Sequence, residues 1–211
     1  RVAEMAKLTE NSFRDVNIAF ANELSMICDK LDISVWELIK LSNRHPRVNI
    51  LQPGPGVGGH CIAVDPWFIV SKNPEESKLI RTAREVNDSK PNWVVDQVRN
   101  SIAIYLGKYP SKRISDIRVA CYGLSFKPDI DDLRESPAIE VVKKVFELEI
   151  GELMIVEPHI AMCPNNTPGR LVNYEYAAAK ANIHVLLVDH SDFKRLQKPD
   201  GLIIDTRGIW F

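Results

Sequence analysis

A glycine-rich loop that ends on a cysteine is the densest chemical signal in the sequence. It covers residues 53–61 and reads Pro-Gly-Pro-Gly-Val-Gly-Gly-His-Cys. Its four glycines can adopt positive φ angles and let the backbone approach a ligand closely. Backbone N–H groups exposed beside the thiol of Cys61 would favour the thiolate, which is the nucleophilic form. From these residues alone, a structural cysteine in a tight turn fits as well as a reactive one.

Three polar residues share one face of the helix expected at the start of the sequence. Lys7, Asn11 and Arg14 follow one another at i, i+4 and i+7. The face nearly opposite them carries residues at spacings of three and four, namely Met5, Thr9, Phe13, Val16, Phe20, Leu24, Ile27 and Leu31. This pattern predicts one long amphipathic helix with a continuous buried stripe. The bland interpretation of the polar face is that it is solvated, as charged helix faces usually are.

The rest of the first half is expected to be helix and loop. A short helix is predicted from Ser34, a suitable N-cap, through Leu41. Prolines and glycines break all periodicity over residues 45–59. Helices are then predicted near 75–86 and 93–106, with an interruption at Lys90-Pro91 because proline disrupts a helix interior.

The pattern changes after residue 116. Short apolar runs at 117–122, 153–156, 183–188 and 202–204 alternate with helical stretches. Runs that are apolar on both faces are typical of a parallel sheet covered by helices on each side. The fold class is therefore predicted as α/β, with an all-helical domain over residues 1–108. A Rossmann-like, doubly wound parallel-sheet domain should follow over residues 109–211.

Composition excludes several classes of partner. The 27 Lys and Arg residues are balanced by 28 Asp and Glu residues, and no dense basic run occurs, so a nucleic-acid or anionic-membrane surface is not expected. No apolar stretch approaches the roughly 18 residues of a membrane span, which predicts a soluble, cytoplasmic protein. The four cysteines form no CxxC pair, and Asp131-Asp132 lacks a nearby His or Cys, so no disulfide scaffold or metal site is predicted.

Three motifs together carry a family resemblance. The run PGPGVGGHCIAVD follows EMAKLTENSFRDVNIAFANE and precedes GLSFKPDIDDLRES, and this order resembles the UDP-glucose/GDP-mannose dehydrogenase family over essentially the whole chain. The resemblance implies a four-electron oxidation of a sugar C6 alcohol to a carboxylate, with NAD+ as oxidant. It casts Cys61 as the nucleophile that attacks the aldehyde intermediate. The resulting thiohemiacetal would become a thioester, which water then hydrolyses.

The resemblance also assigns roles to residues outside the cysteine loop. Lys7 becomes the proton-transfer or oxyanion-stabilising group, and Asn11 positions substrate and water. Asp65 helps to activate water or to orient the lysine, although an Asp before Pro66 also starts turns well. Arg134 would approach NAD. The implied contacts to the nucleotide sugar are Arg14, His45, Arg47, Gly58, Phe126, Lys127 and Arg207.

Two of these assignments keep a bland alternative. The segment His45-Pro46-Arg47 could equally be an ordinary loop, and residues 123–128 could be a simple strand-to-loop turn. The cysteine motif ends in Ala63-Val64-Asp65, where many family members have Pro-Lys-Asp. The missing lysine favours the N-acetylhexosamine branch, with UDP-N-acetylmannosamine as the first choice of substrate.

The absence of a GxGxxG fingerprint bears on the extent of the chain. We expect a fragment that holds the central helical and the C-terminal nucleotide-sugar-binding domains, lacks the NAD domain and cannot turn over alone. The resemblance implies a homodimer through the central helices, including the long first helix, whereas the bland alternative is packing within one chain. A non-catalytic nucleotide-binding dimerisation module is the main competing function. A cysteine hydrolase ranks lower, because no partner that would orient a base is identifiable.

Overall fold

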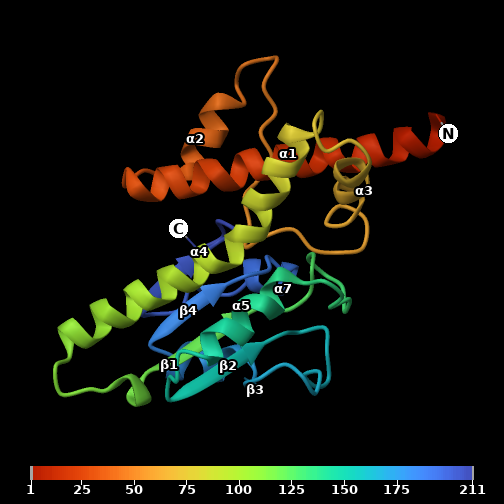
Figure 1. Cartoon of the computed structure of the whole chain (residues 1–211). Coiled ribbons are helices and arrows are strands. Elements are labelled where there is room, and N and C mark those ends of the chain that lie inside the picture. Colours follow the sequence, from red (N-terminus) through yellow and green to blue (C-terminus); the bar gives the residue numbers. More distant parts are fainter. Residues whose placement is uncertain (1, 211) are drawn as a thin grey trace. The chain divides into compact units, whose positions relative to one another are not determined.

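The computed structural model describes residues 2–210 and divides into two compact units (Figure 1). Unit 1 comprises Arg1–Lys90 and unit 2 comprises Pro91–Phe211. The division falls within helix α4 (Lys78–Lys108), whereas the boundary expected after residue 108 coincides with the end of that helix. No helix among residues 2–210 has the length and apolarity needed to cross a membrane.

Unit 1 is helical, as predicted. It contains α1 (Val2–Lys30), α2 (Val35–Ser42), α3 (Asp65–Lys72) and the first part of α4. The predicted cap of α2 is confirmed, because the Ser34 side chain accepts the N–H of Glu37. Helix α3 was not predicted. Its signal was the Asp65-Pro66 pair, since proline is favoured in the first turn of a helix.

The predicted interruption at Pro91 is wrong, because α4 continues through this residue. Proline removes one backbone hydrogen bond and strains the helix by about 3 kcal/mol. Buried side chains hold the helix on both sides of it. Asn87 and Lys90 are buried in unit 1, while Val94 and Val98 are fully buried in the core of unit 2. Tertiary packing thus overrides the local preference.

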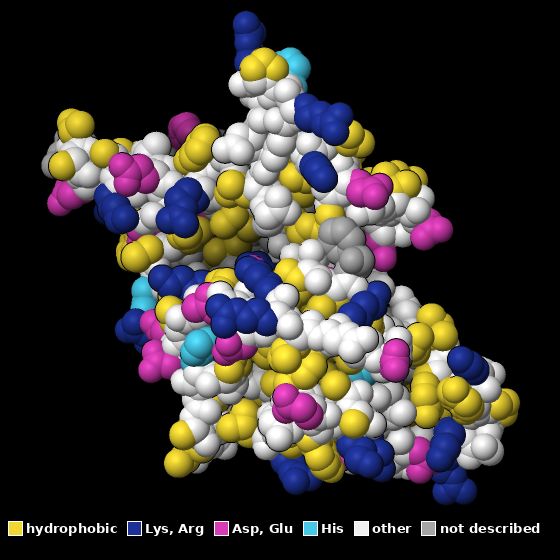
Figure 2. All heavy atoms as spheres, turned by 180° about the vertical axis from the view of Figure 1, so that it is seen from behind, with side chains coloured by type: hydrophobic (Ala, Val, Ile, Leu, Met, Phe, Trp, Pro, Cys, Tyr) yellow, Lys and Arg dark blue, Asp and Glu magenta, His cyan; other side chains and the backbone are white. Residues whose placement is uncertain are grey.

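The continuous buried stripe predicted on α1 is also wrong within the single chain. Phe13 is 67% exposed and Phe20 is 54% exposed, and Figure 2 shows hydrophobic side chains at the molecular surface. The side chains that α1 buries include Asn11, Asp15 and Asn22. These polar groups face inward because α3 and α4 supply hydrogen-bonding partners for them. Packing within unit 1 therefore does not cover the stripe.

Unit 2 is built on a five-stranded parallel sheet with the order β3-β2-β1-β4-β5. The strands are β1 (Arg118–Tyr122), β2 (Glu152–Val156), β3 (Arg170–Leu171), β4 (Ile183–Leu186) and β5 (Leu202–Asp205). All but β3 were predicted. The helical elements of unit 2 besides α4 are η1 (Ile114–Asp116), α5 (Pro137–Phe146), α6 (Tyr174–Lys180) and α7 (Ser191–Lys194).

The inner strands β1, β2 and β4 bury both of their faces. Along β1, Val119 and Cys121 belong to a core with α4 and α5, which Figure 1 shows beside the sheet. Tyr122 belongs to the opposite core with α6 and α7. Helices on both faces of a parallel sheet confirm the predicted α/β fold. Such sheets bind ligands at the carboxyl ends of strands where the strand order reverses, here between β1 and β4.

Candidate active site

Cys61 is the exposed member of the four free cysteines. Its carbonyl accepts the N–H groups of Val64 (3.2 Å) and Asp65 (2.9 Å), so it lies in the turn that begins α3. Gly59, just before it, has a φ of 83°, which favours glycine at this position. Cys28 and Cys121 are buried as expected, and burial raises the pKa of the Cys121 thiol to about 12. The accessible thiol is therefore the one that ends the glycine-rich loop.

A hydrogen-bonded pair of predicted residues adjoins the cysteine turn. Asn11 is buried on α1, and its Nδ2 donates to Oδ2 of Asp65 at 2.5 Å. The carbonyl of Cys61 accepts the backbone N–H of the same Asp65, so the carboxylate and the thiol belong to one turn. Of the polar residues expected on α1, Lys7 and Arg14 remain exposed. The structure thus joins Asn11 to the Cys61–Asp65 turn directly.

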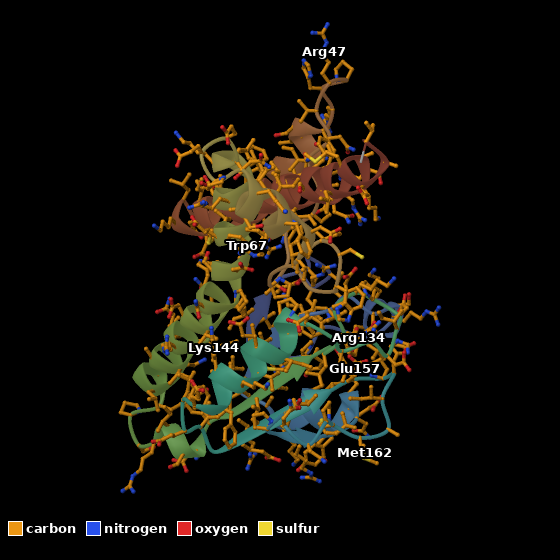
Figure 3. All side chains as sticks on the ribbon, turned by 45° about the vertical axis from the view of Figure 1, so that its right-hand side comes forward. Arg47, Trp67, Arg134, Lys144, Glu157 and Met162 are labelled. Atoms are coloured by element: carbon orange, nitrogen blue, oxygen red, sulfur yellow. The ribbon has the colours of Figure 1, made fainter. Side chains whose placement is uncertain are left out.

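His45 and Arg47 lie on the exposed loop after α2. The backbone N–H of Arg47 donates to Nδ1 of His45 at 3.2 Å, so the two residues contact each other. Figure 3 shows Arg47 at the end of a loop that projects from unit 1. Gly58 is half-buried in the glycine-rich run. Within unit 1, Arg47 is not brought to the Asn11–Asp65 pair.

The carboxyl edge of the sheet in unit 2 carries the remaining predicted residues. Gly123 follows β1 with a φ of 89°, and a Cβ there would lie 2.3 Å from Cβ of Val188, so only glycine allows this close approach of the chain segments after β1 and β4. Phe126 is half-buried, and the exposed Lys127 places its Nζ 5.7 Å from the Phe126 ring centroid.

Two arginines near this edge are held by aspartates. Arg207, after β5, contacts Oδ1 of Asp189 through Nε (2.8 Å) and Nη2 (2.7 Å). Burial acts to raise the pKa of Asp189, but Arg207 and Lys194 outweigh it and hold that pKa below its usual value. Arg134 is exposed and forms a two-pronged contact with the Asp132 carboxylate at 2.6–3.1 Å. Each guanidinium is thereby fixed in direction.

A buried network that the sequence did not reveal holds the loop after β1. His190 is fully buried, and its Nδ1 accepts the backbone N–H of Asp129 at 2.9 Å. Its Nε2 therefore carries the proton and donates to Oε2 of Glu157 at 3.1 Å. The same oxygen accepts the N–H groups of Leu124 (2.6 Å) and Ser125 (3.2 Å). The loop that presents Phe126 and Lys127 is thus anchored at both ends.

The charges of this network follow from its hydrogen bonds. Burial acts to raise the pKa of Glu157, but the bonds from His190 and Leu124 outweigh burial and lower that pKa. The hydroxyl and backbone N–H of Ser191 lower the pKa of Asp129. Both carboxyl groups are therefore ionised near neutral pH.

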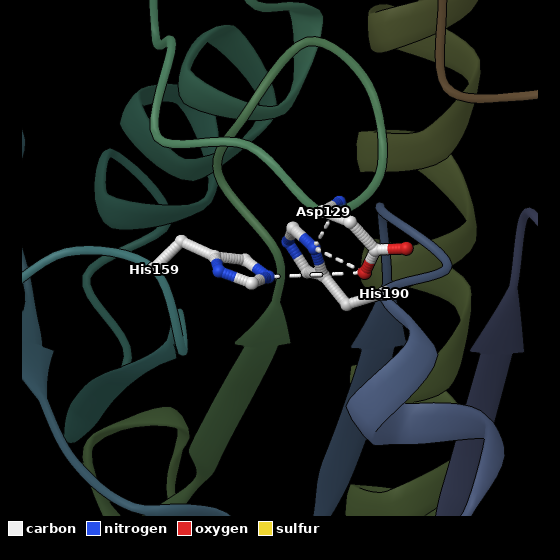
Figure 4. Close-up of side chains that lie close together, drawn as sticks. All are labelled: Asp129, His159 and His190. Atoms are coloured by element: carbon white, nitrogen blue, oxygen red, sulfur yellow. Dashed lines mark hydrogen bonds and ion pairs between the residues drawn. The ribbon is translucent and has the colours of Figure 1, made fainter.

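The grouping of Asp129, His159 and His190 has the donor types of a metal site (Figure 4). A metal would need a free lone pair on each imidazole. The Nδ1 lone pair of His190 is already used by the Asp129 N–H, and its Nε2 proton faces Glu157. The donor set therefore does not fit a metal ion.

The residues at the β1 turn do not fit a dinucleotide either. In the dinucleotide-binding fold, the N–H groups of the first strand-to-helix turn bind the pyrophosphate, and an acid near the next strand binds ribose. Here the N–H groups of Leu124 and Ser125 are taken by Glu157, which is itself the acid that follows β2. Among residues 2–210, these two N–H groups and this acid are therefore not free for that mode of NAD binding.

Comparisons with known proteins match both units. Residues 1–89 match the central-domain model of the UDP-glucose/GDP-mannose dehydrogenase family, and residues 120–211 match its UDP-binding-domain model. A UDP-N-acetyl-D-mannosamine dehydrogenase from Yersinia pestis is 59% identical over 100% of this chain and 51% of its own length. An NDP-N-acetyl-D-galactosaminuronic acid dehydrogenase from Ralstonia solanacearum is 58% identical over 100% of this chain and 48% of its own.

Solved structures agree with the sequence relatives. A UDP-D-ManNAc dehydrogenase from Pyrococcus horikoshii matches with a TM-score of 0.83 and 34% identity, covering 100% of this chain and 49% of that one. The UDP-N-acetyl-mannosamine dehydrogenase Cap5O from Staphylococcus aureus matches with a TM-score of 0.79 and 40% identity, covering 100% and 47%. The chain spans about half the length of the curated relatives it matches. The chain belongs to the UDP-glucose/GDP-mannose dehydrogenase family.

Proposed function

We propose that this chain supplies the thiol and the nucleotide-sugar-binding groups of a nucleotide-sugar 6-dehydrogenase. The proposed reaction is the NAD-dependent, four-electron oxidation of UDP-N-acetyl-D-mannosamine to UDP-N-acetyl-D-mannosaminuronate. The observation that carries the proposal is the exposed Cys61 in the turn whose Asp65 is hydrogen-bonded to Asn11. Relatives named for UDP-N-acetylmannosamine and for an N-acetylgalactosamine derivative support an N-acetylhexosamine substrate. NAD+ as the oxidant rests on the family resemblance alone.

The proposed chemistry of unit 1 centres on sulfur. The Cys61 thiolate adds to the aldehyde carbon, and the alkoxide of the thiohemiacetal forms beside Lys7, whose fixed positive charge stabilises it. Transfer of a hydride from that carbon to NAD+, which would serve as the oxidant when bound, leaves a thioester on Cys61. Asp65 then accepts a proton from the attacking water, and the thiol leaves as the carboxylate forms. Asn11 holds Oδ2 of Asp65, which fixes the direction of the other carboxylate oxygen.

Unit 2 supplies the groups proposed to bind the nucleotide. Lys127 and Arg207 offer positive charge for a diphosphate, and the half-buried ring of Phe126 offers an apolar surface. The further substrate contacts that we propose are Arg14, His45, Arg47 and Gly58. We assign Arg134 to NAD on the basis of the resemblance.

Two properties of the assembly follow from the proposal. The exposed apolar residues of α1 would pack in a homodimer, since an apolar stripe of this length is unfavourable in water. Light scattering of the chain should then give the mass of a dimer. The groups of the β1 turn are already paired, so the chain alone should not produce NADH from UDP-N-acetylmannosamine.

Calorimetric titration tests the substrate class. UDP and UDP-N-acetylmannosamine should bind the chain, whereas GDP should bind at least about tenfold more weakly, a difference of about 1.4 kcal/mol. The variant Lys127→Ala should weaken UDP binding, while Lys144→Ala, which removes a lysine from α5, should not. Equal affinity for UDP and GDP, or no binding of either, would contradict the proposal.

A further inference from the structure

A network of buried polar side chains connects α1 to the first part of α4 within unit 1. Its members are at most 1% exposed and comprise Asp15, Asn22, Arg84 and Asn87. Arg84 donates to Oδ1 of Asp15 at 2.6 Å, and Asn87 donates to the same oxygen at 2.8 Å. Nδ2 of Asn22 donates to Oδ1 of Asn87 at 2.9 Å. These bonds form one continuous chain through the interior.

Both ends of this network contact the cysteine loop. Oδ1 of Asn22 accepts the backbone N–H of Gly54 at 2.9 Å, in a buried contact. At the other end, Nη1 of Arg84 lies 3.5 Å from the carbonyl oxygen of Ile62, the residue after Cys61. Gly54 and Ile62 thus lie on either side of the other three glycines of the loop and of the thiol. Asn11 adds a third contact at Asp65, where α3 begins.

Packing of two helices alone does not account for this network. Apolar side chains of similar volume would hold α1 against α4 equally well or better, because burying an ion pair carries a large desolvation penalty. Apolar residues could not accept the Gly54 N–H or donate to the Ile62 carbonyl. A glycine-rich loop needs such contacts, since it has more backbone freedom to lose than other segments.

We propose that Asn22 and Arg84 are positioning residues that hold the Cys61 loop in its working conformation, with Asp15 and Asn87 fixing their direction. This inference rests on the proposed function, because it assigns the loop a thiol whose placement matters. The network residues act through the backbone of the loop and do not touch the substrate.

The first test measures the backbone of the loop in the whole chain. In the wild type, the Gly54 amide should exchange its hydrogen as slowly as amides in the middle of α1. The variant Asn22→Ala should speed this exchange about tenfold or more, because it removes the acceptor. Exchange of Gly54 in the wild type as fast as in the exposed loop of residues 45–49 would overturn the proposal without any variant.

The second test separates positioning from simple stability. Lys90→Met breaks another buried contact between the same helices, the bond from Nζ to Oγ of Ser25 at 2.6 Å, and leaves the bond between Asn22 and Gly54 in place. Asn17→Ala is the matched amide control, since Asn17 lies on α1 and its side chain bonds to the Phe13 carbonyl of the same helix. UDP-N-acetylmannosamine should slow alkylation of Cys61 in the wild type and in both controls.

In Asn22→Ala this protection should fall several-fold while calorimetric binding of UDP stays unchanged. Equal protection in Asn22→Ala and Lys90→Met would overturn the positioning role. If the wild type shows no protection at all, the proposed function fails, and the exchange of Gly54 still decides whether the network holds the loop.

Discussion

The two units contact the loops that carry candidate site residues with different kinds of buried polar group. In unit 1, a charged pair between helices, Asp15 and Arg84, reaches the carbonyl of Ile62, just after Cys61. In unit 2, a buried imidazole, that of His190, bridges the Asp129 N–H and the Glu157 carboxylate at the ends of strands. The carboxyl ends of strands expose backbone N–H groups, and a single side chain can accept hydrogen bonds from several of them. Helices pair their own backbone groups internally, so a helical unit needs several side chains to reach a loop.

The largest expected effect comes from breaking the charged pair of unit 1. Arg84→Met leaves Asp15 buried without its cation, and this should lower the free energy of unfolding of unit 1 by about 3–5 kcal/mol at pH 7. Hydrogen exchange of the α1 amides reports on unit 1 alone. Burial already raises the pKa of Asp15 to about 6 against the charge of Arg84. The loss should therefore shrink at pH 5, where Asp15 is largely neutral, and an unchanged loss would contradict this electrostatic explanation.

A second prediction concerns the pH dependence of unit 1. Burial lowers the pKa of Lys90 to about 7, against the charge of Asp29. The unfolded chain then binds the Lys90 proton more tightly than the folded chain does. The stability that comes from a neutral Lys90 in the folded chain is therefore lost as pH falls through 7 and is complete only above about 10.5. Between pH 7 and 9.5 the unfolding free energy of unit 1 should rise by about 3 kcal/mol on this account.

Comparison with Lys90→Met isolates that contribution. The variant should lack the rise, because methionine does not titrate, and the α1 amide exchange measured at both pH values gives the difference. Parallel pH profiles for the wild type and the variant would show that Lys90 is charged in the folded protein.

A smaller effect is expected from the imidazole of unit 2. His190→Ala removes the acceptor of the Asp129 N–H and a donor to Glu157, so the loop that carries Lys127 should loosen and UDP affinity should fall about tenfold. His159→Ala is the control, because the His159 ring lies beside that of His190, with centroids 4.7 Å apart, but its Nε2 makes no hydrogen bond among residues 2–210 and approaches Oδ1 of Asp129 only at 3.8 Å. Calorimetry should find equal affinity in His159→Ala and the wild type.

The smallest effect is expected from an exposed ion pair. Arg99 and Asp96 lie 2.7 Å apart on α4, and both side chains are more than half exposed. Water and salt screen such a pair, so Arg99→Met should change the unfolding free energy of unit 2 by less than about 0.5 kcal/mol. A loss as large as that of Arg84→Met would remove the contrast between buried and exposed pairs.

The sequence predicted those parts of the fold whose signals are local. Strand β1 could be predicted because its run is apolar on both faces, and α2 because Ser34 is a suitable N-cap. Strand β3 has two residues and leaves no periodic pattern. The break expected at Pro91 failed because buried neighbours on both sides hold α4 together. The helix preferences of residues near Pro91 contain no information about that tertiary packing.

The candidate site likewise has a part that the sequence predicted and a part that it did not. Cys61 and Asp65 lie within one motif, and the family resemblance linked Asn11 to them. The support for the loop was hidden because its partners are distant in sequence: Asp15 and Arg84 are 69 residues apart, and Glu157 and His190 are 33 apart. The one available signal was the spacing of Asn11, Asp15 and Asn22 on a single helix face. The polar face considered from the sequence was instead Lys7, Asn11 and Arg14, with solvation as its bland interpretation. The structure leaves Lys7 and Arg14 exposed and buries Asn11 with Asp15 and Asn22.

Protection of the Cys61 thiol tests the central claim most directly. The chain is treated with iodoacetamide with and without saturating UDP-N-acetylmannosamine, and the modification of each cysteine is followed by mass spectrometry, with the half-buried Cys163 as internal reference. Cys61 should react faster than Cys163, and the nucleotide sugar should slow the reaction at Cys61 alone by about tenfold or more. The same rate at Cys61 with and without a nucleotide sugar that calorimetry shows to be bound would contradict the account.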